Sequence, residues 1–85
     1  MQYHYKLMAR VSDMIDNQLR DNKPPETLYT MNRLIALGYD NIESKKLICK
    51  CFMIEMIDAM KNNKVLNEER YIKNLLKLPE EPDNK

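Results

Sequence analysis

The sequence is poor in the residues that build sheets and tight turns. It holds one glycine and no tryptophan among 85 residues, and valine occurs only as Val11 and Val65. Residues of high helix propensity dominate instead, which disfavours a sheet. Because Gly38 is the only glycine, a glycine-rich loop that cradles phosphate is also excluded. The sequence therefore predicts an all-α protein with one hydrophobic core, since a chain this short has no room for two.

Cysteine and histidine are equally scarce. Cys49 and Cys51 are the only cysteines and His4 is the only histidine. On a helix the two cysteines point about 200° apart, so they cannot bridge each other. Their spacing does not suit a zinc half-site, and no second Cys or His pair follows. We therefore expect two reduced, buried structural thiols, because His4 lies at an N-terminus expected to fray and is a poor base for a catalytic cysteine.

Paired carboxylates occur, but without the partners that a catalytic or metal site needs. Neither Glu55 with Asp58 nor Glu68 with Glu69 is accompanied by a histidine or a second acidic cluster. We interpret such pairs as solvent-exposed side chains and as acidic residues in the first turn of a helix, where the helix dipole favours them. The sequence thus predicts a protein that is not an enzyme and binds no metal or cofactor.

Neither charge nor hydropathy points to a polyanion or a membrane. Fourteen basic and thirteen acidic residues give a net charge of +1, which favours no nucleic acid or charged surface. Apolar runs do not exceed four residues, as in 51–54, and the N-terminal segment lacks the apolar stretch of a signal peptide. We expect no spanning helix and a cytoplasmic location.

Apolar residues recur at three- and four-residue intervals in four segments, which predicts a compact assembly of four helices ordered long, short, long, short. Their expected bounds are about 3–20, 25–37, 42–62 and 68–76. Residues 1–78 form the single domain in this prediction. The acidic and proline-containing tail 79–85 has nothing to bury and is expected to be disordered.

Local signals mark most of the helix ends. Pro24 and Pro25 end the first helix and begin the second, because a residue before proline is pushed out of the α region. Gly38 stands where a helix C-terminus needs positive φ, and Tyr39 is the apolar residue that often seals such a cap. The third helix begins at a capping box, "DNIE" at 40–43, and "NNK" at 62–64 breaks it.

The third helix is predicted to be the spine of the fold. The residues expected to pack on it come from the other three helices: Leu7, Val11, Met14 and Ile15; Leu34 and Ile35; Tyr71, Ile72 and Leu75. It carries two apolar arcs where a peripheral helix needs one. It is therefore either covered on both sides or presents one arc to a partner. The candidate contact residues are Leu47, Cys51, Ile54 and Ile57.

From this pattern we predict a small interaction or scaffold module that self-associates, as a homodimer, or binds another protein. A nucleic-acid-binding module is the alternative. The second helix, the turn at Gly38 and the third helix have the outline of a helix-turn-helix, with Lys45, Lys46 and Lys50 at the start of the second of these helices. Against this alternative, the third helix is longer and more apolar than recognition helices usually are, so nucleic acid is the less favoured partner.

Two resemblances to known families add to this prediction. The segment "RLIALGYDNIESKKLI" resembles the first half of a ubiquitin-associated domain, where a leucine-rich helix ends in a Gly-Tyr or Gly-Phe loop that touches ubiquitin. That fold continues with a short helix, whereas the helix predicted here is long. Residues 15–78 resemble a family of small uncharacterised bacterial all-helical proteins. The matching elements are 15–18 (IDNQ), 33–39 (RLIALGY), the helix 42–62, 68–71 (EERY) and 75–79 (LLKLP).

The bacterial family implies a fold and no reaction. Its members often carry histidines at two positions of the first helix and two of the third, which would suit a metal or polar cluster. Those positions correspond to Met8, Ser12, Ile42 and Lys46 in this chain. Since no histidine stands at any of them, the resemblance implies that this protein keeps the scaffold without any histidine-based activity.

Overall fold

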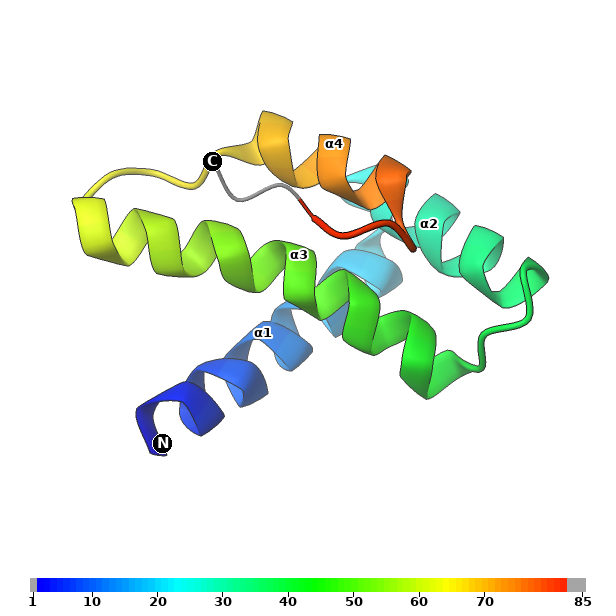
Figure 1. Cartoon of the computed structure of the whole chain (residues 1–85), viewed down its shortest axis with the longest axis horizontal. Coiled ribbons are helices and arrows are strands. Elements are labelled where there is room, and N and C mark those ends of the chain that lie inside the picture. The colour runs from blue at the N-terminus through cyan, green and yellow to red at the C-terminus, as the bar shows by residue number, and fades with distance from the viewer. Residues whose placement is uncertain (1, 83–85) are drawn as a thin grey trace.

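The computed structural model describes residues 2–82, with side chains from residue 6 onward. The described part consists of four helices: α1 (Gln2–Asp21), α2 (Pro25–Ala36), α3 (Asn41–Asn62) and α4 (Glu68–Lys77). It contains no strand. Figure 1 shows α1 rising from below and crossing behind α3, with α4 and α2 above α3 in this view. The predicted all-α fold of alternating long and short helices is confirmed.

The connection between α2 and α3 is built by the residues that were predicted from the sequence to end α2 and begin α3. Gly38 has a φ of +109°. Its N–H donates to Ile35 O at 3.0 Å, and Tyr39 N–H donates to Leu34 O at 3.1 Å, which together form a Schellman motif. Asp40 and Glu43 then complete the capping box that begins α3. These local bonds fix both helix ends without help from the rest of the fold.

The predicted break after α3 is also confirmed. Asn63 adopts the left-handed conformation with a φ of +50°, and Lys64 N–H donates to Ala59 O at 3.0 Å. Asn67 caps α4 by accepting from Arg70 N–H at 3.0 Å. Asparagine tolerates the left-handed region better than most residues, so "NNK" ends the helix for a local reason.

The spine prediction for α3 is confirmed, because α3 packs against each of the other three helices. Its residues Ile48 and Cys51 are fully buried. They meet the predicted inward residues of the neighbouring helices, of which Leu7, Val11, Ile15, Leu34, Tyr71 and Leu75 are buried. Ile72 is partly buried and packs against the same core.

For two residues the predicted burial in the core is wrong. Met14 is 38% exposed and Ile35 is 41% exposed. The reason at Ile35 is the rotation of α2, which buries Thr27 and Thr30 completely on the same side as Leu34. Thr27, Thr30 and Leu34 share one side of α2, at i, i+3 and i+7, and Ile35 lies about 100° round the helix from Leu34, outside that contact. An apolar pattern alone favours the larger residue, so the burial of the threonines was missed.

The C-terminal end of α4 is tied to α2. Leu78 is buried, and Arg33 donates from its guanidinium to Leu78 O at 2.7 Å and to Leu75 O at 3.0 Å. These bonds satisfy carbonyl groups that a helix end leaves without partners. After Leu78 the chain turns back beside α3 (Figure 1), where Glu81 forms an ion pair with Lys50 at 3.1 Å. Residues 83–85, part of the tail expected to be disordered, lie outside the described residues.

Candidate functional site

The contact residues predicted on α3 lie in two different environments. Leu47, Ile54 and Ile57 are partly exposed, while Cys51 has no exposed surface. Cys51 lies one helical turn before Glu55, whose carboxylate binds Arg70 of α4, so α4 covers this side of α3. As a contact residue Cys51 is therefore a wrong prediction. Of the other three, Leu47 and Ile57 pack in part against the core, and Ile54 lies partly exposed on the open side of α3.

Both cysteines are free and buried, as expected of structural thiols. Burial raises the pKa of the Cys51 thiol to about 12 and also raises the pKa of Cys49. A neutral thiol is a poor nucleophile and a poor metal ligand. The part of the chain with described side chains contains no group of three or more residues that could hold a metal ion.

These thiols give a first prediction. At pH 8 the native protein should react with a chromogenic disulfide reagent far more slowly than free cysteine does, whereas both thiols should react at once in denaturant. Because the folded pKa of Cys51 is raised, stability should also fall as pH rises above about 8.5, where the unfolded thiols ionise, toward 12. Absorbance of the released thiolate reports the reaction, and one fast-reacting thiol in the native protein would contradict it.

The three lysines of the nucleic-acid alternative are not equally available. Lys45 forms an ion pair with Asp16 of α1 at 2.7 Å, and Lys50 forms one with Glu81 of the tail. Lys46 has no ion pair within the described residues and is exposed. Two of the three charges are thus already opposed by carboxylates.

Two clefts flank the N-terminal half of α3. The cleft between α1 and α3 has a volume of about 290 Å³, and its lining residues are Met8, Ser12, Ile42, Lys45, Lys46 and Cys49. It brings together Met8, Ser12, Ile42 and Lys46, the four positions that the resemblance aligns with histidines. The other cleft has a volume of about 440 Å³, and its lining residues are Tyr39, Glu43, Lys46, Leu47 and Lys50. The side chain of Lys46 borders both clefts.

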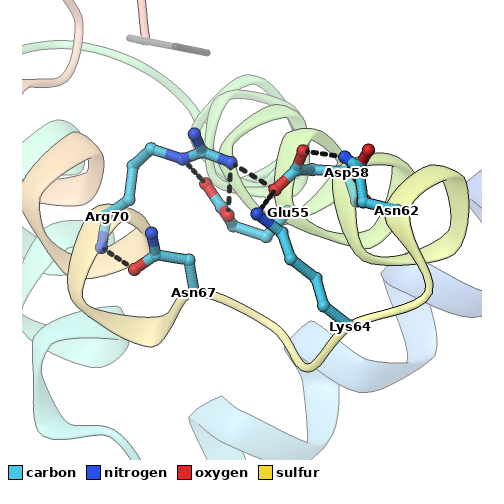
Figure 2. A network of polar contacts seen from close by, with 6 residues as sticks. All are labelled: Glu55, Asp58, Asn62, Lys64, Asn67 and Arg70. Atoms are coloured by element: carbon cyan, nitrogen blue, oxygen red, sulfur yellow. Dashed lines mark hydrogen bonds and ion pairs between the residues drawn. The ribbon is translucent and has the colours of Figure 1, made fainter.

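A buried polar network joins α3 to α4 (Figure 2). Arg70 donates from Nε to Glu55 Oε2 at 2.6 Å and from Nη2 to Glu55 Oε1 at 2.9 Å, and Nη2 also reaches Asp58 Oδ2 at 3.1 Å. The Glu55 side chain is only 1% exposed. Our interpretation of Glu55 and Asp58 as solvent-exposed was therefore wrong for Glu55. The signal that could have found it is its place on the buried arc of α3, which requires a cationic partner.

The outer part of this network is held by the loop after α3. Lys64 forms an ion pair with Asp58 Oδ2 at 3.2 Å, and Asn62 donates to Asp58 Oδ1 at 2.8 Å. The hydrogen bond from Lys64 lowers the pKa of Asp58, and Arg70 adds to the effect. Both Glu55 oxygens accept from Arg70, so the network fastens two helices and leaves no carboxylate oxygen directed at a substrate.

A second network joins α1, α2 and α4. Thr27 Oγ1 donates to Gln18 Oε1 at 2.7 Å, and Tyr71 OH donates to the same oxygen at 2.8 Å. Burial raises the pKa of Tyr71, whose ring meets Phe52 edge-on at 5.1 Å. Gln18, Tyr71 and Glu55 border a cleft of about 320 Å³. In this cleft the Glu55 carboxylate is paired with Arg70 and the Tyr71 hydroxyl donates to Gln18, so both groups serve the packing of the helices.

The candidate site is therefore the open side of α3, where apolar and cationic side chains alternate. No helix of the described part is long and apolar enough to cross a membrane. Comparison of the chain with protein families, curated proteins and solved structures finds no match. The function is therefore argued from the geometry of α3 alone.

Proposed function

We propose that this protein is a small non-enzymatic interaction module that self-associates through the open side of α3. One observation carries the proposal. Although α3 is the central helix, Ile54 and Ile57 in its C-terminal half remain partly exposed, and Met60 at its end is 55% exposed. Ile57 also packs in part against the core, as Leu47 does, whereas Ile54 and Met60 give α3 apolar surface outside that packing.

Hydrophobic burial would drive the association. Apolar surface removed from water contributes about 25 cal/mol per Å², from which the loss of translational and rotational freedom is subtracted. The surface lies on a helix that three other helices hold in place, so little further ordering is needed on binding. We assign the contact to the C-terminal half of α3, where Ile54, Ile57 and Met60 lie.

The bacterial setting and cytoplasmic location are part of the same proposal. Two free, buried thiols suit a reducing compartment. The gathering of Met8, Ser12, Ile42 and Lys46 in one cleft supports the resemblance to the bacterial family, because positions from two different helices share one site. On this view the chain keeps the family's scaffold and uses it for contact.

Exchange of Ile54 for glutamate tests the proposal. We expect light scattering to give a wild-type mass of twice the 10.2 kDa chain and an Ile54→Glu mass of one chain, because a buried charge without a partner opposes association. Leu76→Glu is the matched control, since Leu76 is 51% exposed on α4. Its mass should equal that of the wild type.

Circular dichroism separates loss of the interface from loss of the fold. Equal helicity in the wild type and the Ile54→Glu variant is expected. A wild-type protein that stays monomeric across a dilution series would rule out self-association, and loss of helicity in Ile54→Glu would place this residue in the core.

A further inference from the structure

The cleft of about 440 Å³ beside the N-terminal half of α3 combines cationic and apolar groups. Lys46 and Lys50 lie four residues apart, so their side chains stand on the same side of the helix one turn from each other. Tyr39 and Leu47, both partly buried, line the space beside them. A ligand of this cleft needs negative charge along one edge and an apolar group on the other.

The structure contains one such negative group. Glu81 of the chain's own tail binds Lys50 Nζ through both carboxylate oxygens, at 3.1 Å and 3.4 Å. Leu78 is buried and anchors the segment that delivers Glu81. The pair itself is open to water, with side chains 55% and 82% exposed. Such exposed pairs hold weakly, so another carboxylate can replace Glu81 at little cost.

Lys46 is the second cationic group that lines the cleft. It stands on the same cleft without an ion pair in the described part of the chain, so one of the two lysines is left for an external anion. Glu43 also lines the cleft, but its Oε1 accepts from Asp40 N–H at 3.2 Å in the helix cap. Its carboxylate is therefore held at the start of α3.

We propose that this cleft binds an acidic segment of a partner protein, in which carboxylates meet Lys46 and Lys50 and an apolar side chain meets Tyr39 and Leu47. Glu81 is then an intramolecular competitor. A peptide fits better than nucleic acid, because two lysines beside a glutamate neutralise few phosphates, while the group that already pairs with Lys50 at the edge of the cleft is a carboxylate on a peptide chain. This goes beyond self-association, which we assign to the C-terminal half of α3.

Fluorescence anisotropy on the full chain tests the proposal. The probe is a labelled peptide of sequence Glu-Glu-Leu-Phe-Glu-Glu, and the same peptide with glutamine in place of glutamate is its neutral control. We expect the acidic peptide to bind and the neutral one to bind at least about tenfold more weakly, with affinity falling as salt rises. Equal binding of the two peptides would overturn the proposal.

Variants locate the site. Lys46→Glu should weaken binding about tenfold or more, whereas Lys73→Glu, which makes the same charge change at an exposed position of α4, should not. Glu81→Gln should tighten binding by about twofold to fivefold, because it frees Lys50. Each of these side chains is exposed, so folding should be unaffected, as circular dichroism checks. An unchanged affinity in Lys46→Glu would overturn the assignment.

Two further experiments distinguish this proposal from self-association and from nucleic-acid binding. The Ile54→Glu variant should still bind the peptide, whether or not the wild type self-associates, so the two proposals can fail separately. Mixed-sequence duplex DNA should not displace the peptide at equal concentration. Displacement by DNA would overturn the choice of a protein partner in favour of a polyanion, and a peptide that binds only to the dimer would place the site at the interface between copies.

Discussion

Replacement of Arg70 by methionine is expected to lower the free energy of unfolding by about 3–5 kcal/mol. The cause is the Glu55 carboxylate, which loses Arg70 as its partner in this variant. Glu55 is 1% exposed, and both of its oxygens accept from Arg70. Without the guanidinium, the folded chain must keep an ionised carboxylate away from water or protonate it, and both cost free energy.

Urea denaturation followed by circular dichroism measures this loss. A domain of this length is expected to have a stability of about 4–13 kcal/mol, so the variant could be partly unfolded without denaturant. An excluded osmolyte that favours the compact state then brings it into the measurable range. Lys73→Met is the matched control, because Lys73 is an exposed cation of the same helix. Its stability should change by no more than about 0.5 kcal/mol.

The double variant Arg70→Met with Glu55→Leu separates the two parts of the effect. If the cost comes from the unpaired carboxylate, removing that carboxylate should restore most of the stability, since apolar replacements of a buried pair are often neutral or better. A single Arg70→Met variant as stable as Lys73→Met would show that Glu55 does not depend on Arg70. A double variant no more stable than the single one would assign the loss to packing of the arginine stem.

Leu34→Ala should cost about 2–5 kcal/mol, because it leaves a cavity at a fully buried position of α2. Its neighbour provides the control. Ile35 is 41% exposed, and its replacement by alanine removes less buried surface than Leu34→Ala does while favouring the helix. We therefore expect Ile35→Ala to cost no more than about 1 kcal/mol.

The comparison of these neighbours tests the rotation of α2 directly. Chemical denaturation midpoints at an unchanged slope give the two free-energy differences. The apolar pattern of the sequence placed both residues in the core, whereas the structure buries Leu34 with Thr27 and Thr30 instead. Equal losses in the two variants would mean that α2 is turned so that Ile35 faces inward.

Much of the candidate site depends on contacts that a sequence pattern does not reveal. The apolar surplus on α3 and the lysines at its start could be found by helical periodicity, which requires only a repeat along one element. The burial of Cys51 and Glu55 depends on where α4 lies. The ion pairs of Lys45 and Lys50 depend on Asp16 and Glu81, which are far from them in the chain.

The sequence by itself determined the fold class, the number and order of the helices and most of their ends. These features rest on interactions within a few residues, such as the positive φ of Gly38 and the capping box of Asp40 and Glu43. The tertiary structure alone decided how far the covered side of each helix extends. The side of α2 that carries Thr27, Thr30 and Leu34 is the one turned to the core, and that rotation leaves Ile35 partly in water.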